Sequence, residues 1–152
     1  MTESSWVAQL EEPGYRWESR EPPATDADLA QLSAFLGRPL PDDYSAFLRF
    51  SNGGALEYKD LWYLRLWRAA DIPSWSTVYG FTPDAIAGAV AIADNGGGEA
   101  VVFDYRPERP DGDYPLYLIN FVTIEWDGAI PLTPDVRSLL LRRTDLFGHE
   151  EA

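Results

Sequence analysis

The stretch LPDDYSAFLRFSNGG, residues 40–54, predicts one short helix with both of its ends defined. Pro41 suits a first helical turn, because its ring pre-sets φ and an N–H there would have no partner within the helix. Asp42 and Asp43 place negative charge at the positive end of the helix dipole. We expect Asn52-Gly53-Gly54 to end the helix, because Asn and Gly tolerate the left-handed conformation. The buried face between these ends follows the spacing i, i+3, i+4 and consists of Tyr44, Phe47 and Leu48.

A second amphipathic helix precedes this one. Thr25 is typical of an N-cap residue, and Asp26 and Asp28 follow it in the first turn. Gly37 is expected to stop the helix. Its apolar stripe consists of Leu29, Leu32, Phe35 and Leu36. The two helices are joined by a very short link, so we expect them to form a tight pair.

The rest of the chain reads mainly as strands. Apolar runs at 89–93 and 100–105 flank the Gly-rich segment Asp94 to Glu99, which predicts a β-hairpin. Further strands are predicted at 61–67, where Trp62 and Trp67 would point to opposite faces, and at 116–124. The segment 68–79 is compatible with a short helix or with irregular structure, and a last helix follows Pro134-Asp135. Helices, an antiparallel meander and a closing helix make an α+β domain.

Two of these motifs, in this order and at this separation, resemble the SMI1/KNR4 family (SUKH superfamily). One is the Leu40-Pro-x-x-Tyr44 helix that closes on Asn52-Gly-Gly54, and the other runs from Ile92 through Glu99 to Asp104. The resemblance covers roughly Thr25 to Leu146. It implies a single α+β domain with a mainly antiparallel central sheet and helices packed around it. We therefore divide the chain into an N-terminal extension that packs on the body (1–24), a SUKH-like domain (25–147) and a tail (148–152).

Composition narrows the function. With 152 residues, 45% of them hydrophobic, the chain suits one packed domain. The absence of cysteine, of a signal peptide at Met1–Leu10 and of any apolar stretch of about 20 residues leads us to expect a cytoplasmic protein that does not enter membranes. The net charge of −13 disfavours nucleic-acid binding and favours a basic protein partner. Alternatively, the acidity only maintains solubility.

Few catalytic motifs are compatible with the sequence, and we expect no cofactor, metal or catalytic residue. Gly96-Gly97-Gly98 is followed by Glu99 rather than by the Lys of a phosphate-binding loop. The only histidine, His149, is the fourth residue from the end of the sequence, where it is poorly placed as a catalytic base. No EF-hand spacing is present. A pair of carboxylates acting as in glycosidases stays open, because 25 acidic residues allow many chance pairs.

The resemblance implies a non-enzymatic protein-binding domain. Many members of the family are immunity proteins that neutralise toxins, often nucleases, of contact-dependent or polymorphic toxin systems. The alternative is a housekeeping adaptor without a toxin partner, and sequence does not separate the two. We place the partner-binding surface on acidic and aromatic residues around the Gly-rich hairpin and after Gly54: Glu57, Tyr58, Asp60, Trp75, Tyr79, Asp94, Glu99, Asp104 and Tyr105.

Overall fold

The structure is a computed structural model that describes residues 2–106 and 114–145. It confirms an α+β fold with a central antiparallel sheet. Within the described ranges, seven strands pair in the order in which they occur along the chain. They are β1 (Tyr15–Arg20), β2 (Gly54–Tyr58), β3 (Trp62–Leu66), β4 (Ala89–Asp94), β5 (Glu99–Asp104), β6 (Leu116–Asn120) and β7 (Ile130–Thr133).

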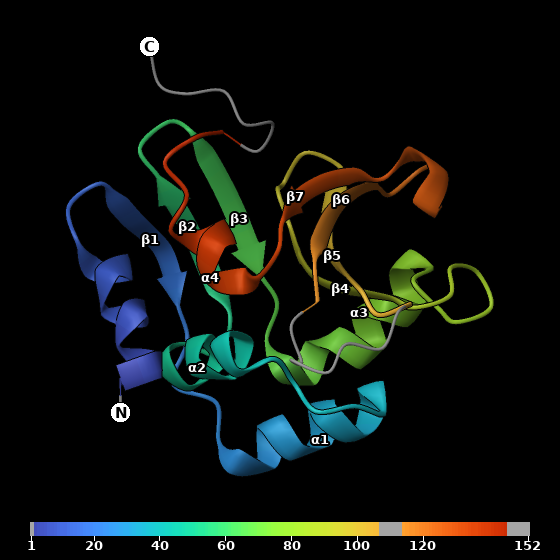
Figure 1. Ribbon diagram of the computed structural model, residues 1–152, viewed down its shortest axis with the longest axis horizontal. Helices are drawn as coiled ribbons and strands as arrows, with labels where there is room; N and C mark the ends of the chain where they lie inside the picture. The colour runs from blue at the N-terminus through green and yellow to red at the C-terminus, as the bar shows by residue number, and fades with distance from the viewer. Residues whose placement is uncertain (1, 107–113, 146–152) are drawn as a thin grey trace.

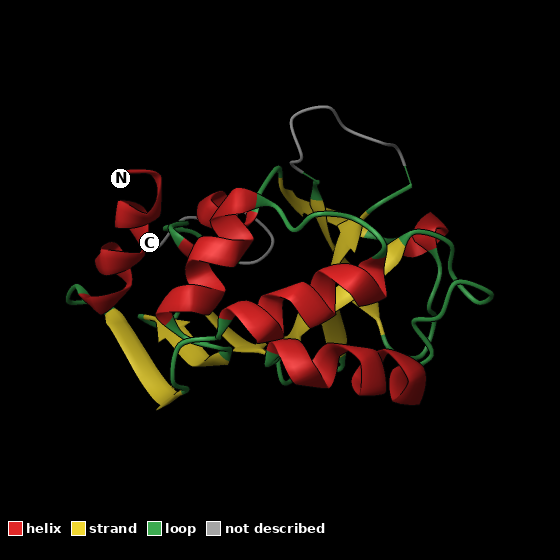
Figure 2. Cartoon of the chain, turned by 90° about the horizontal axis from the view of Figure 1, so that it is seen from below, coloured by secondary structure: helices red, strands yellow, loops and turns green. Residues whose placement is uncertain are grey.

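The helices gather along one side of the strands. Figure 1 shows α1, α2 and α3 running below the sheet, and Figure 2 shows them from below, in front of the strands. The α-helices are α1 (Asp26–Leu36), α2 (Asp42–Phe50), α3 (Ile72–Tyr79) and α4 (Val136–Leu140). Short 3₁₀ segments are η1 (Thr2–Glu11), η2 (Ala69–Asp71) and η3 (Trp126–Gly128).

The pairing between β3 and β4 is the shortest in the sheet. Only two residue pairs join these strands, Arg65 with Asp94 and Leu66 with Ala93. Five pairs join β2 to β3, and five join β4 to β5. Figure 1 accordingly shows two groups of strands, β1–β3 and β4–β7. The structure thus consists of two half-sheets that meet at the ends of β3 and β4.

Helix α1 begins and ends where the sequence predicts. The Thr25 hydroxyl accepts a hydrogen bond from the Asp28 N–H at 3.1 Å, and the Asp28 carboxylate accepts one from the Thr25 N–H at 2.8 Å. This capping box satisfies two backbone donors that the first turn would otherwise leave unpaired. Gly37 ends the helix in the left-handed conformation, with its N–H donating to Ser33.

The ends of α2 differ from the prediction. Pro41 is the N-cap rather than the first helical residue, and the helix begins at Asp42. The C-cap is Ser51 in an extended conformation, so Asn52-Gly53-Gly54 does not form the left-handed cap that we expected. Gly53 and Gly54 have positive φ values of 89° and 124° for another reason. Gly53 precedes β2 and Gly54 begins it, and backbone atoms of other segments lie very close to both glycines.

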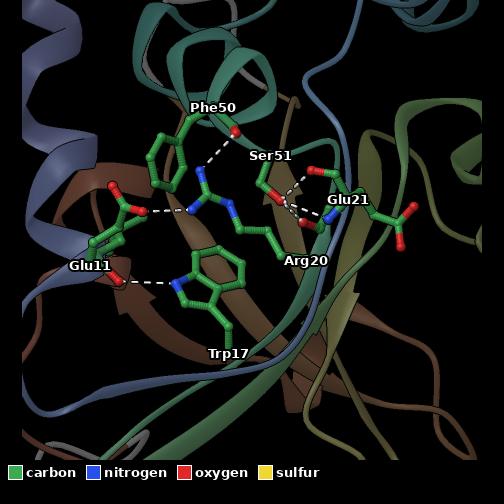
Figure 3. Close-up of polar contacts among 8 residues, drawn as sticks. Glu11, Trp17, Arg20, Glu21, Phe50 and Ser51 are labelled. Atoms are coloured by element: carbon green, nitrogen blue, oxygen red, sulfur yellow. Dashed lines mark hydrogen bonds and ion pairs between the residues drawn. The ribbon is translucent and has the colours of Figure 1, made fainter.

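Figure 3 shows how this segment is fastened. The fully buried hydroxyl of Ser51 accepts a hydrogen bond from the Glu21 N–H and donates to the Gly53 carbonyl at 2.6 Å. Beside it, the Arg20 guanidinium lies 3.9 Å from the centre of the Phe50 ring, pairs with Glu11 at 2.8 Å and donates to the Phe50 carbonyl. These contacts join η1, β1 and the end of α2.

The N-terminal residues are part of the sheet. β1 is an edge strand that pairs with β2 from Tyr15–Tyr58 to Arg20–Gly54. The Trp17 indole donates to the Leu10 carbonyl at 3.0 Å, which holds η1 against the strand. The Tyr15 hydroxyl donates to the Leu140 carbonyl of α4 at 2.6 Å, so the first strand contacts the last helix.

Other segments refine the prediction. The strand predicted at 116–124 ends at Asn120, and the ambiguous segment 68–79 is mostly helical, with Pro73 in the first turn of α3. Trp62 lies on β3, whereas Trp67 follows the strand and packs against Trp75 and Tyr79, so the alternation predicted for these two residues on one strand does not extend to Trp67. Residues 107–113 and the tail with His149 lie outside the described residues.

Two tyrosines give opposite predictions for stability. The Tyr44 side chain is 1% exposed, and its hydroxyl has no hydrogen-bond partner in the described part of the chain. We expect Tyr44→Phe to raise the free energy of unfolding by about 1 kcal/mol, because it removes an unpaired buried polar group. Tyr15→Phe should lower it by about 1 kcal/mol, because it removes the bond to Leu140. Urea unfolding of both variants measures this, and equal changes would contradict the assignment.

The raised pKa values of the same two tyrosines predict how the free energy of unfolding changes at high pH. Burial raises the pKa of Tyr15 to about 12, from its ordinary 10, and burial also raises the pKa of Tyr44. The unfolded chain therefore loses these protons at lower pH than the folded chain does. The free energy of unfolding should fall as the pH rises from about 10 towards about 12. In Tyr15→Phe this slope should be smaller but not zero, since Tyr44 still contributes.

Candidate functional site

One face of the β1–β3 half-sheet carries polar side chains, and we call it the open face. The opposite face packs buried residues such as Leu56 and Leu64 into the core. Residues paired across antiparallel strands share a face, so Arg16, Glu57 and Tyr63 lie together. Arg65, two residues after Tyr63, belongs to the same face. Arg16 and Glu57 form an ion pair at 2.5 Å.

Asp94 is the centre of the polar contacts beside the open face. Its carboxylate, 2% exposed as a residue, ends β4 directly opposite Arg65. It accepts hydrogen bonds from the Trp67 indole at 2.9 Å, from Arg65 Nε at 3.2 Å and from the Gly96 N–H at 2.9 Å. One buried side chain thus joins β3, the segment after it and the Gly-rich loop.

The Gly-rich loop forms the predicted hairpin turn between β4 and β5. The Asn95 side-chain oxygen accepts from the Gly97 N–H at 2.9 Å and from the Glu99 N–H at 3.3 Å, and its amide donates to the Glu99 carboxylate at 2.9 Å. The N–H groups of Gly96, Gly97 and Glu99 are therefore used within the loop. A phosphate-binding loop must instead direct such donors at its ligand.

Aromatic rings continue the site from Trp67 to β6. The Trp67 ring lies 5.0 Å from Trp75 and 5.9 Å from Tyr79, measured between ring centres. Trp75 and Tyr79 lie one turn apart on the same face of α3. Tyr79 in turn lies 4.7 Å from Phe121. Trp67 is buried at this position, whereas Tyr79 is 38% exposed.

Arg65 is the cation in this arrangement, and its side chain is 52% exposed. Partial burial lowers the pKa of the guanidinium, but the hydrogen bonds and charge of Asp94 outweigh this effect and raise the pKa overall. Electrostatic interaction with Tyr63 and Tyr79 also raises the pKa of Arg65. It is thus a permanent positive charge held against a buried carboxylate.

A shallow pocket of about 150 Å³ opens next to Arg65, between the open face and α3. Its walls include Trp75, Glu21 and an ion pair in which Arg68 donates to Asp71 at 2.8 and 3.3 Å. Pockets for whole small-molecule ligands usually measure about 300–1,000 Å³. This pocket has room for about one side chain rather than for a whole ligand.

Comparison with known protein families identifies the chain. The family model for the SMI1 / KNR4 family (SUKH-1) matches residues 23–142. The chain belongs to the SMI1/KNR4 family. No curated protein matches it. Membership supports a role in protein interaction. The match begins at residue 23, so η1 and β1 of this SMI1/KNR4 domain lie outside the matched range although β1 pairs directly with β2.

The structure places the nine predicted binding residues in several locations. Five of them lie on the open face or on the elements beside it: Glu57, Trp75, Tyr79, Asp94 and Glu99. Asp94 is buried there, so it positions its neighbours rather than presenting itself to a partner. Whether these five residues bind a partner stays a prediction.

The other four lie elsewhere. Tyr58 is buried on the core face against Trp62, and Asp60 is exposed in the turn between β2 and β3. Asp104 and Tyr105 lie at the opposite end of β5 from the Gly-rich loop. Both are buried, and Asp104 pairs with Arg106 at 2.9 Å. The expectation of one surface is therefore wrong for Tyr58, Asp104 and Tyr105, because the half-sheets bury them.

Sequence reasoning missed three members of the site. Arg65 had a visible signal, since Leu64-Arg65-Leu66 alternates as a strand with one polar face does. Trp67 had a partial signal in its phase relative to Trp62. Phe121 had none, because its contact with Tyr79 depends on how the segment after β6 folds back on α3.

Two classes of site are absent from the described ranges. Residues 2–106 and 114–145 contain no group of three or more His, Cys, Asp or Glu side chains that could hold a metal ion. The helices of these ranges are too short or too polar to cross a membrane.

Proposed function

We propose that this SMI1/KNR4 protein is a non-enzymatic immunity protein that binds and neutralises a cognate toxin, a nuclease of a bacterial contact-dependent or polymorphic toxin system, in the cytoplasm. Family membership supports the protein-interaction part of this proposal. The observation that carries the rest is how the charges of the chain are arranged.

Within the described ranges, ion pairs are formed by six of the eleven arginines of the sequence. Ion pairs match Arg16, Arg20, Arg49, Arg65, Arg68 and Arg106 each with one carboxylate. Acidic residues outnumber basic ones by 25 to 12, so the remaining carboxylates leave the surface with a strong negative field. Such a field attracts a cationic partner and speeds the encounter. A toxin that cleaves nucleic acid must carry a basic surface, which makes it a partner of the required charge.

Binding, rather than catalysis, also suits the site. The N–H groups of Gly96, Gly97 and Glu99 are bonded within the Gly-rich loop, and the pocket beside Arg65 accommodates a side chain rather than a substrate. The two arginines of the pocket are held in place by Asp94 and Asp71. We propose that the chain needs no cofactor, metal or catalytic residue for its role.

The test starts with the gene beside the one for this chain. We expect it to encode a large protein that ends in a toxin domain. Expression of that domain alone in a bacterial host should stop growth, and co-expression of the full chain should restore it. With purified proteins, an equimolar amount of the chain should abolish nuclease activity, and raising the salt concentration should slow association.

Other outcomes decide against this function. A neighbouring gene without a toxin, together with a partner from general metabolism, would support the adaptor. A complex that leaves nuclease activity unchanged would contradict neutralisation. Turnover of any glycoside or other metabolite by the purified chain would contradict the non-enzymatic part of the proposal.

A further inference from the structure

Charge is divided unevenly between the two halves of the molecule. The sequence from Ala69 to Tyr105 contains five carboxylates and no Lys, Arg or His, and the sequence 114–136 contains three carboxylates and again no basic residue. These segments form α3 and β4–β7, on the right-hand side of Figure 1. Arg106 lies between them, where it pairs with Asp104 and lies 4.1 Å from the centre of the Trp126 ring.

The same half exposes apolar side chains. Val78 on α3 is 74% exposed and Val122, just after β6, is 92% exposed. Between them, Tyr79 packs on Phe121 with their ring centres 4.7 Å apart. Large apolar side chains that stay exposed after folding gain no free energy of burial, and burial against a partner would supply that gain. Clustered exposure of this kind marks interaction sites on soluble domains.

Exposed carboxylates lie on the segments that carry or follow these apolar residues. Asp84 lies on the loop after α3, and Glu125 and Asp127 lie on the segment after β6; all three are exposed. The two segments are held together by the Trp126 indole, which donates to the Ala87 carbonyl at 2.8 Å. The Gly-rich loop joins the group through the Phe121 N–H, which donates to Gly98 at 2.9 Å and brings Glu99 to this end of the sheet.

We propose that this region, the α3–η3 surface, docks a basic protein whose contact surface carries apolar side chains at its centre. We define this surface by Val78, Tyr79, Phe121 and Val122 and by the acidic residues of the joined segments, Asp84, Glu99, Glu125 and Asp127. The apolar residues provide the contact that holds the complex, and the carboxylates steer a cationic partner to it. A second copy of this chain is disfavoured, because it would bring equal negative charges together. The proposal deepens the proposed function by naming where the toxin binds.

The first test needs no natural partner. The isotope-labelled full chain is titrated by NMR with a twelve-residue peptide of alternating Lys and Leu, and in parallel with one of alternating Lys and Ser. Amide shifts should move first at residues 78–84 and 121–127. The Lys-Leu peptide should bind roughly tenfold more tightly than the Lys-Ser peptide, since it buries apolar area. Equal affinities, or shifts centred on η1 and β1, would overturn the proposal.

Charge-reversed variants provide the matched comparison. Glu125→Lys combined with Asp127→Lys should weaken binding of the Lys-Leu peptide at least about tenfold. Glu12→Lys combined with Glu18→Lys makes the same change in net charge at two other exposed residues, one in the turn between η1 and β1 and one on β1. This control should have a much smaller effect. Similar losses in both double variants would show that net charge alone governs binding, and would overturn the proposal.

The same variants separate this proposal from the proposed function. If the toxin domain encoded by the neighbouring gene binds the wild type, and binding survives E125K/D127K unchanged, the surface is wrong while the immunity role stands. If the peptide maps to the α3–η3 surface but the toxin domain is not bound at all, the surface stands and the immunity role fails.

Discussion

Gly53→Ala is expected to destabilise the fold by about 4 kcal/mol, a large share of the 5–15 kcal/mol typical of a domain. Gly53 has φ of 89°, and a Cβ atom added there would lie 2.6 Å from the Leu66 carbonyl oxygen and 2.9 Å from the Arg68 nitrogen. Both are backbone atoms of the segment that leads out of β3, so neither can rotate away. Relief would require β2 and β3 to separate.

Two other glycines serve as controls for this variant. Gly98 also has positive φ, but an added Cβ would meet nothing within 4 Å, so Gly98→Ala should show only the backbone strain, about 1 kcal/mol. Gly128 has open space and no positive φ, so Gly128→Ala should be nearly neutral. Urea unfolding followed by tryptophan fluorescence measures all three. A loss at Gly53 no larger than at Gly98 would show that the close approach is unimportant.

Asp94→Ala should cost about 3 kcal/mol and should also disturb the candidate site. The change leaves the buried Trp67 N–H without its acceptor and removes the partner of Arg65. The Gly96 N–H loses its acceptor as well, so the Gly-rich loop should become more mobile. Hydrogen exchange at residues 95–98 and the emission maximum of tryptophan measure these local effects separately from global stability.

An exposed ion pair provides the comparison for Asp94. Asp71→Ala removes the partner of Arg68, whose side chain is 55% exposed, and solvent and salt already screen that pair. Its effect on stability should be far smaller. Asp94→Asn should lie between the two, since the amide oxygen still accepts one hydrogen bond. A loss for Asp71→Ala equal to that for Asp94→Ala would argue against burial as the source of the effect.

Features that depend on neighbours in sequence could be predicted. The capping box of α1 lies within four residues, and the β4–β5 hairpin is written in one continuous segment with its turn residues. The sequence indicates that Gly53 and Gly54 need a left-handed backbone, but the predicted reason, a helix C-cap, is wrong. Gly53 lies against the Leu66 backbone, 13 residues away, and Gly54 lies against the Ser19 backbone, 35 residues away.

Features that depend on distant partners could not be predicted. β1 pairs with β2 from Tyr15 to Tyr58, and most of its residues are exposed, so its sequence shows no buried alternation. β7 contains Pro131 and lies at the edge of the sheet, where proline is tolerated but obscures a strand pattern. In the site, aromatic character in the sequence indicates Trp75 and Tyr79 as candidates. The burial of Asp104 and Tyr105 depends on the packing of β5, which the sequence does not show.

The narrow junction between β3 and β4 has a consequence for how the molecule tolerates change. Two residue pairs and the Asp94 contacts carry most of the direct connection between the half-sheets. Substitutions in the loops of the β4–β7 half therefore transmit little distortion to β1–β3. We expect that half to accept new surface residues readily, so that related chains can exchange partner specificity while their scaffold endures.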